Sequence, residues 1–375
     1  MAAPARPAPP AARVTTSRRV TPHHQGQTMT DQILRRAPRL AVFDELSTGA
    51  AAPTWLRDGV VGAWGFAADA TVTLITVSAN ATFLVSEHGT PTAVTRVARP
   101  GSTSDAVALE SELTWVAALA ADGVARVPTG LTTAAGTYVA TVRDAAGTGW
   151  TCVSFAYIPG DVLEDVADPV PFYAEIGRTT AALHEHAARW RPPSPFRRHS
   201  WTVPDMLGES ARWGRWEDAH LAPGETALLD RAQGAALDVL VDAKPGGPGW
   251  GLIHADLRPS NVMTDGLTLT VIDFDDCGYG WFGYDFAAAL TFVEHVPYAP
   301  EMATEWLAGY EQVRPLTAED LHRACALSML RRLQMLGRAT THPQDVLLPE
   351  LRAEQVSGTV EVAQRYLRRR TWLIS

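Results

Sequence analysis

Hydrophobic and polar residues alternate in three short stretches that begin at residue 71. These stretches, residues 71–78, 82–86 and 92–97, are rich in Thr and Val and are separated by turn-forming residues. The pattern predicts three consecutive β-strands. Residues 31–60, which precede them, have the pattern of a helix followed by irregular chain.

The spacing of apolar residues then changes to that of a helix. They recur on one face at Leu109, Leu113, Val116 and Ala120. Ser104 or Asp105 can cap the start of this helix, and Gly123 ends it. Two more strands are predicted at residues 137–142 and 150–157, on either side of a glycine-containing turn.

The rest of the chain has mainly helical periodicity. The segment Ile158-Pro159-Gly160-Asp161 interrupts the pattern, and we interpret it as a hinge between two lobes. Four helices are predicted after it: one through Phe172, Ile176, Leu183, Ala187 and Trp190, one through Met302, Trp306, Tyr310 and Val313, and two over residues 318–338 and 358–372. The predicted organisation is a disordered tail at 1–30, a first lobe at 31–158 and a second lobe at 159–375.

Composition narrows the class of protein. Apolar residues make up 46% of the chain, enough for a sizeable core, and a net charge of −9 gives no general affinity for nucleic acid. No run of 18 apolar residues predicts a membrane span. The three widely spaced cysteines indicate neither a disulfide framework nor a metal site, and they fit a reducing cytoplasm. Residues 1–30 contain no acid and no apolar signal region, and Met29 is a candidate start.

Residues 250–285 carry the strongest chemical signal. They contain, in order, His254-Ala-Asp256-Leu-Arg258-Pro-Ser-Asn261 and then an apolar strand that ends in Asp273-Phe-Asp275. Phosphoryl transfer needs a carboxylate beside the attacking hydroxyl, and oxygen ligands that hold a divalent cation against the phosphates. Asp256, Asn261 and Asp273 supply these groups in that order. The structural alternative is an Asx-capped turn followed by an ordinary buried strand.

This order of residues resembles the aminoglycoside phosphotransferase and choline kinase superfamily. The first motif resembles that family's His-Gly-Asp-Leu-His-Pro-x-Asn, and Tyr284-Asp285-Phe-Ala resembles its Tyr-Asp-Leu-Ala. The resemblance implies an α+β, bilobal, protein-kinase-like fold. Its N-terminal lobe would be a small antiparallel β-sheet with one main helix, and its C-terminal lobe would be larger and mostly helical.

The resemblance also implies roles for individual residues, with ATP and Mg²⁺ as cofactors. Asp256 would orient, or deprotonate, the acceptor hydroxyl, and Asn261 and Asp273 would bind Mg²⁺. Arg258 would reach the γ-phosphate, or would instead be a solvated surface arginine. Asp285 would support the catalytic loop by accepting backbone hydrogen bonds.

The kinase-like pattern further implies a basic residue on the third strand paired with a helix glutamate. Arg96 and Glu112 fill these places, with Arg99 as the alternative to Arg96. The chain has a single lysine, Lys244, so an arginine must take the role that is usually filled by lysine. Both strand arginines could instead be exposed.

The nucleotide contacts are less well specified by the sequence. No Gly-x-Gly-x-x-Gly lies between the first two strands, and residues 78–82, with Asn80, occupy that turn instead. Asn80 could help to cover phosphates or could simply form the turn. Residues 154–158, which include Phe155 and Tyr157, would offer backbone hydrogen bonds to adenine.

A loop after the metal strand combines acids with aromatic residues. Asp275, Asp276 and Trp281 are the candidates for binding a cationic acceptor through charge and cation–π contacts. An amino alcohol, a hydroxy amino acid such as homoserine, or an aminoglycoside would fit. Alternatively, these aromatic residues only pack the second lobe.

Two functions follow from these observations. The first is an ATP- and Mg²⁺-dependent phosphotransferase acting on a hydroxyl of a small, amine-bearing molecule. The second is a non-catalytic, pseudokinase-like regulatory protein that binds nucleotide. Arg96 and the missing glycine loop favour the second function, whereas the complete set of Asp256, Asn261 and Asp273 favours the first.

Overall fold

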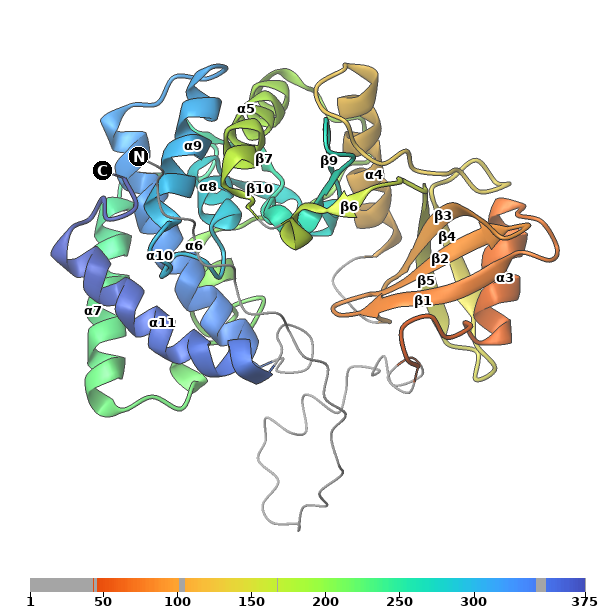
Figure 1. The fold of residues 1–375 in the computed structure, drawn as a ribbon, viewed down its shortest axis with the longest axis horizontal. Helices are drawn as coiled ribbons and strands as arrows, with labels where there is room; N and C mark the ends of the chain where they lie inside the picture. The colour runs from red at the N-terminus through yellow and green to blue at the C-terminus, as the bar shows by residue number, and fades with distance from the viewer. Residues whose placement is uncertain (1–42, 44–45, 101–104, 167, 342–348, 375) are drawn as a thin grey trace, which may run out of the picture.

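The computed structural model describes residues 43, 46–100, 105–166, 168–341 and 349–374. The predicted tail at residues 1–30 and the capping candidate Ser104 lie outside these residues. Figure 1 shows the described chain as a β-sheet with a covering helix at one end and a larger helical body at the other.

A five-stranded antiparallel sheet forms the first lobe, in the order β1-β2-β3-β5-β4 (Figure 1). Its strands are β1 (Thr71–Val77), β2 (Ala81–Glu87), β3 (Thr90–Val97), β4 (Val139–Arg143) and β5 (Gly149–Ala156). Alternate side chains of β2 are fully buried, as expected for a sheet with one face on a core. The five predicted strands are therefore confirmed to within a few residues at each end.

Two helices accompany this sheet. In α4 (Ala106–Ala121), Asp105 is the capping residue, because its carboxylate accepts a hydrogen bond from the Ala108 N–H at 3.0 Å. In α3 (Thr54–Trp64), Gly59 permits close packing on β4, since a Cβ at this position would come within 2.2 Å of Val142. Helix α3 was not predicted at these bounds. Residues 46–53 are irregular, as the sequence predicts for the later part of 31–60, but α3 then follows them; the predicted helix at the start of that range lies mostly outside the described residues.

The second lobe is mostly helical, as predicted. Its helices are α5 (Tyr173–Arg189), α6 (Val203–Met206), α7 (Pro223–Val239), α8 (Gly283–Ala289), α9 (Ala299–Glu311), α10 (Ala318–Thr341) and α11 (Pro349–Arg368). The four predicted helices correspond to α5, α9, α10 and α11. Helix α7 was missed because it buries only Leu229, Ala232 and Ala236, two of which are small residues with a weak apolar signal.

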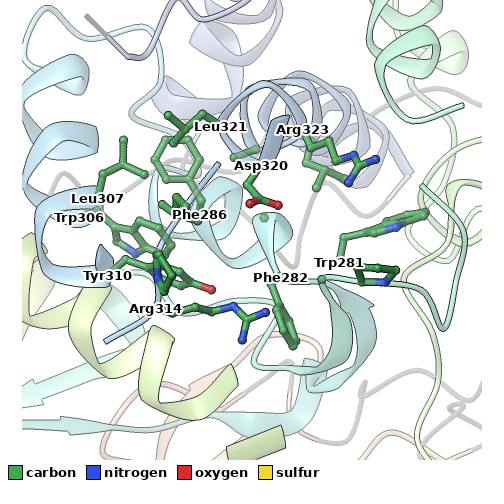
Figure 2. Close-up of a pocket in the computed structure, with 17 residues that line it drawn as sticks. Trp281, Phe282, Phe286, Trp306, Leu307, Tyr310, Arg314, Asp320, Leu321 and Arg323 are labelled. Carbon is green, nitrogen blue, oxygen red and sulfur yellow. The ribbon is translucent and has the colours of Figure 1, made fainter. Parts of the chain in front are cut away.

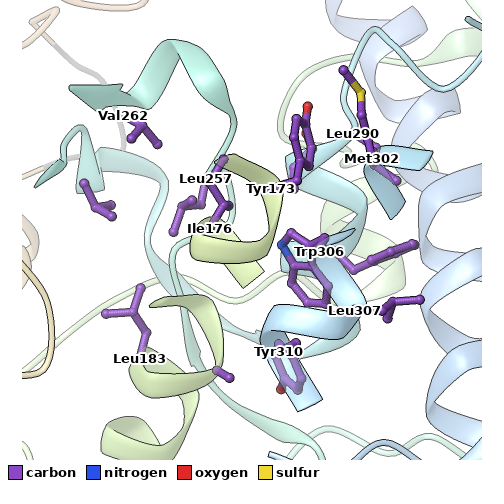
Figure 3. Packing of buried hydrophobic residues seen from close by; sticks show 14 of the residues in the cluster. Tyr173, Ile176, Leu183, Leu257, Val262, Leu290, Met302, Trp306, Leu307 and Tyr310 are labelled. Carbon is purple, nitrogen blue, oxygen red and sulfur yellow. The ribbon is translucent and has the colours of Figure 1, made fainter. Parts of the chain in front are cut away.

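The largest hydrophobic core lies between α5 and α9. Tyr173, Ile176 and Trp306 meet there, as Figure 3 shows. The same core includes Trp115 of α4, whose ring makes an edge contact with Phe274 at 5.8 Å between centroids. Helix α4 therefore connects the core of the second lobe to the sheet of the first.

Short strands between the helical blocks position the motif residues. Strand β7 (Trp250–Ile253) pairs with β10 (Gly278–Trp281), and β8 (Val262–Thr264) lies between β6 (Asp161–Val162) and β9 (Leu269–Val271). The His254–Asn261 motif follows β7 and Asp273 follows β9. A hydrogen bond from the Ile272 N–H to the Asn261 carbonyl at 2.9 Å joins the two segments. Among the described helices, none has the length and apolar character to cross a bilayer.

Candidate active site

The loop after β7 is held by the buried carboxylate of Asp285 at the start of α8. This carboxylate accepts hydrogen bonds from the backbone N–H of His254 at 3.0 Å and of Ala255 at 2.6 Å. His184 Nε2 lies 3.0 Å from it as well, and burial lowers the pKa of His184, so a neutral ring donates here. Ala255 has a φ of 68°. A left-handed conformation costs an L-residue about 1–2 kcal/mol, so Asp285 holds a strained loop in shape.

Asp256 has hydrogen-bonding partners on both carboxylate oxygens. Arg331 Nη2 donates to Oδ1 at 2.5 Å, Asn261 Nδ2 donates to Oδ2 at 2.9 Å, and Arg258 Nε lies 3.5 Å from Oδ2. Burial raises the pKa of Asp256, but the guanidinium groups of Arg258 and Arg331 outweigh it, and the pKa lies below its usual value. Asp256 is therefore a carboxylate, with 17% of its side chain exposed in the cleft.

Asn261 and Asp273 offer oxygen atoms to the same cavity. The Asn261 amide nitrogen donates to the Asp256 main-chain oxygen at 2.8 Å. Asn261 Oδ1 accepts only a long hydrogen bond from the Ser260 hydroxyl, at 3.5 Å, and keeps a lone pair for a cation. The Asp273 carboxylate is 46% exposed, and partial burial together with Asp275 raises its pKa well above the usual range. Such a carboxylate is stabilised by a nearby cation. One carboxylate and one amide oxygen fit Mg²⁺, which takes few protein ligands and completes its shell with phosphate oxygens and water.

The arginine of β3 and the glutamate of α4 form a buried ion pair. Arg96 Nη2 donates to both oxygens of Glu112, at 2.7 and 2.8 Å, and Arg96 Nη1 lies 3.5 Å from Asp273 Oδ1. Burial opposes the charge of Arg96, but Glu112 and the cleft aspartates raise its pKa above the ordinary arginine value. The alternative, Arg99, lies near the Ser78 carbonyl instead, at 3.4 Å. The sheet and helix thus bring a fixed positive charge to the edge of the cleft.

Two adjoining cavities follow the cleft between the lobes. The first, of about 440 Å³, has a mainly apolar lining that includes Ile75, Val94, Phe155, Tyr157 and Ile272. The second, of about 150 Å³, is lined by charged side chains: Asp256, Arg258, Asp273, Asp275, Asp276 and Arg338. Arg96, Asn261 and Asp273 border both cavities. The cleft therefore has an apolar end and a charged end, with the Arg96 and Asp273 side chains where they meet.

The turn between β1 and β2 reaches across this cleft. Asn80 Nδ2 donates to Asp275 Oδ2 at 2.8 Å, and the Asn80 carbonyl accepts from the Ser78 N–H at 2.8 Å. Ser78, Asn80 and Thr82 line the charged cavity. Asn80 thus forms the turn, as one of the two alternatives from the sequence has it, and it also contacts the second lobe; a role in covering phosphates stays a prediction.

Of the three predicted acceptor residues, the structure brings two to the cleft. Asp275 and Asp276 line the charged cavity, where burial and the neighbouring Asp275 raise the pKa of Asp276 to about 7. Trp281 packs on Trp250 at 4.9 Å between ring centroids and lines a separate cavity of about 180 Å³, shown in Figure 2. Strand β10 rises by roughly 3.3 Å per residue, and this carries Trp281 away from the aspartates.

Three residues of the charged end were not anticipated. Trp213 and Arg338 line the cavity, with the Arg338 guanidinium 4.5 Å from the Trp213 ring centroid. Arg331 forms an ion pair with Asp256. Arg331 did leave a signal, because it stands with Arg332 in the middle of an otherwise apolar helical segment. An arginine that is buried in such a segment needs an ionic or hydrogen-bonding partner.

Comparisons with known proteins agree with this geometry. The sequence model of the phosphotransferase enzyme family matches residues 71–324. The structure of a microcompartment-associated aminopropanol kinase is 36% identical, with a TM-score of 0.76 over 85% of this chain and 98% of that one. An amicoumacin kinase structure in complex with AMP-PNP and Ca²⁺ shares the fold, with a TM-score of 0.67 at 18% identity over 86% of this chain and 94% of that one. These matches confirm the predicted kinase-like fold.

Two curated relatives are also small-molecule kinases. Amicoumacin kinase from Bacillus subtilis is 25% identical over 53% of this chain and 59% of its own length. A homoserine kinase from Chelativorans sp. is 33% identical over 39% of this chain and 44% of its own length. The chain spans about half the length of the curated relatives it matches.

Proposed function

Since the chain belongs to the phosphotransferase enzyme family, we propose that it is an ATP- and Mg²⁺-dependent kinase that phosphorylates the hydroxyl of a short amino alcohol. One observation supports this above all others: Asp256, Asn261 and Asp273 border a single small cavity beside an apolar one. The aminopropanol kinase supports the choice of acceptor, because its similarity extends over nearly its whole length. The free, buried thiols of Cys152, Cys277 and Cys325 fit the predicted cytoplasmic location.

The apolar cavity suits the adenine of ATP. Phe155 and Ile158, on and just after β5, and Ile272 on the opposite side provide flat and branched apolar surface. Arg96, held by Glu112, lies where the phosphates would pass toward the charged cavity. Because Arg96 Nη2 is already held by both carboxylate oxygens of Glu112, the side chain needs little rearrangement to bind phosphate.

Asp256 carries the chemistry on the acceptor side. Its carboxylate, ionised and held on both oxygens, accepts the hydrogen bond of the acceptor hydroxyl and directs the oxygen lone pair at the γ-phosphorus. A new O–P bond forms while the bond to the β–γ bridging oxygen breaks, and ADP leaves. The hydroxyl proton passes to Asp256 and then to solvent. Asn261 and Asp273 would hold Mg²⁺, which would supply charge neutralisation at the phosphates.

The charged cavity favours a small cationic acceptor. Its volume of about 150 Å³ is well below the roughly 300–1,000 Å³ of pockets for drug-sized ligands. That supports an amino alcohol over an aminoglycoside. Asp276 is half-buried there beside Asp275, and a bound ammonium group would stabilise both carboxylates.

The test is phosphorylation of a panel of acceptors with ATP and Mg²⁺, measured as phosphate gain by mass spectrometry. We expect 1-amino-2-propanol to be phosphorylated much faster than 1,2-propanediol, which has the same carbon skeleton without the amine. Asp276→Asn should reduce this preference, and Asp256→Asn should lower kcat by at least about 100-fold while ATP still binds. Nucleotide binding without phosphate gain by any acceptor would instead indicate the non-catalytic regulator.

A further inference from the structure

Arg331, in the middle of α10, has no solvent exposure. All the nitrogen atoms of its guanidinium group donate hydrogen bonds to the loop that carries Asp256 or to residues packed against that loop. Its Nε donates to Thr291 Oγ1 at 2.7 Å. Its Nη1 donates to the Ala255 carbonyl at 2.8 Å and to the Tyr284 hydroxyl at 2.7 Å. Its Nη2 donates to Asp256 Oδ1 at 2.5 Å. The planar fork of an arginine is the only side chain with enough donors to satisfy these four acceptors at once.

These contacts hold both the loop and the carboxylate that it carries. Asp285 holds the two N–H groups of the His254–Ala255 segment, and Arg331 holds the Ala255 carbonyl on the next peptide. At Asp256, Arg331 occupies Oδ1 and Asn261 occupies Oδ2, so rotation of the carboxylate is blocked from both sides. Each oxygen retains a second lone pair for another donor.

On the basis of the proposed function, we propose that Arg331 is a positioning residue that fixes the Asp256 carboxylate at the angle required to accept the acceptor hydroxyl. A buried ion pair contributes little to stability compared with well-packed apolar residues, whereas it defines geometry closely. Reactions that depend on alignment lose about 100-fold in rate when a reacting group moves by 1 Å. The effect of Arg331 should therefore appear in kcat rather than in nucleotide affinity.

The neighbouring Arg332 provides a matched control. It is also fully buried, and it donates to Glu294 at 2.8 Å and to Thr359 at 2.9 Å. Its hydrogen bonds lead to α11 and to the segment after α8, and it does not line either cavity of the cleft. Both arginines thus lie on α10, are fully buried and pair with a carboxylate. They differ in that carboxylate, which is Asp256 for Arg331 and Glu294 for Arg332.

The experiment compares Arg331→Lys and Arg331→Met with Arg332→Lys and Arg332→Met in the full-length chain. We expect kcat to fall about 100-fold in both Arg331 variants with the ATP Kd changed by less than about twofold, and to stay within about threefold in the Arg332 variants. Two further variants, Arg331→Ala and Arg332→Ala, test chemical rescue. Added guanidinium should restore part of the kcat of Arg331→Ala, because it can occupy the space beside Asp256, and it should leave the kcat of Arg332→Ala unchanged. If Arg331→Met does not fold, Arg331→Lys still decides the kinetic comparison.

A crystal structure of Arg331→Lys gives a readout that does not depend on turnover. We expect the Asp256 carboxylate to be rotated or displaced relative to the wild type. Equal kcat losses in the Arg331 and Arg332 variants, or an unmoved Asp256 carboxylate in Arg331→Lys, would overturn the inference. A wild-type protein that phosphorylates no acceptor would overturn the proposed function, and the position of Asp256 in the variant would still decide the structural part.

Discussion

Asp285→Asn tests how far the shape of the catalytic loop depends on one buried carboxylate. The wild-type carboxylate accepts from the N–H groups of His254 and Ala255 and from His184 Nε2, at distances of 3.0, 2.6 and 3.0 Å. An asparagine has nearly the same shape but only one acceptor oxygen, and its NH₂ group must face at least one of these donors.

The expected loss of stability follows from the number of donors affected. A hydrogen bond to a charged acceptor contributes about 1.5–3 kcal/mol, and a buried donor left without a partner costs about 1–3 kcal/mol. One lost bond and one unsatisfied donor together destabilise the fold by about 2.5–6 kcal/mol. At roughly 2 °C per kcal/mol for a chain of this size, the melting temperature should fall by about 5–12 °C.

Thermal unfolding and steady-state kinetics check this prediction together. Because Ala255 is held in a left-handed conformation, the loop should relax, and kcat should fall at least about 100-fold along with the melting temperature. Asp230→Asn, on the exposed surface of α7, is the control and should change stability by no more than about 0.5 kcal/mol. An Asp285→Asn protein that melts within 2 °C of the wild type, by the ~2 °C per kcal/mol scale, would refute the reasoning.

Three further predictions concern the cleft and its surroundings. Asp273→Ala should weaken ATP binding in Mg²⁺ but not in its absence, and calorimetric titrations with equal Mg²⁺ dependence in both proteins would count against a ligand role. Asn80→Ala removes the contact with Asp275 and should raise the KM for ATP a few-fold at unchanged melting temperature. Burial, with Arg212 and Arg198, lowers the pKa of His199 to about 3, so the unfolded chain takes up this proton first and stability should fall as pH drops from about 6.5 toward 3. Urea denaturation at a series of pH values gives the free energy of unfolding as a function of pH. Between pH 6.5 and 3 this free energy should fall less steeply in His199→Gln, by up to about 1.4 kcal/mol per pH unit, and an unchanged pH dependence would contradict the low pKa of His199.

The sheet and the catalytic loop could be predicted from the sequence because both are local patterns. Alternating apolar residues define each strand, and the motif from His254 to Asn261 places its groups on a single loop. Helix α7 escaped prediction because alanines supply much of its buried face. The partners of Asp256 on α10 could not be assigned, since a separation of 75 residues between Arg331 and Asp256 is closed only by tertiary packing.

The residues that bind the acceptor were also difficult to assign from the sequence. Asp276 and Trp281 are close in sequence, and a loop of acids and aromatic residues suggests one binding surface. Strand β10 separates them, because Trp281 belongs to its far end and packs on Trp250. Composition identified the charge of the site, but the direction of a short strand decided which side chains share it.

The hydrogen bond between Asn80 and Asp275 has a consequence for the order of events during turnover. Asn80 and Asp275, which share this hydrogen bond, both line the charged cavity, so an ammonium group that binds there competes with the turn for the Asp275 carboxylate. Competition of this kind is reciprocal: an acceptor that binds Asp275 weakens the contact between the turn and the second lobe, and so loosens one wall of the charged cavity. We therefore expect the dissociation rate of ADP to increase with the concentration of amino alcohol, and to be insensitive to a diol that lacks the amine.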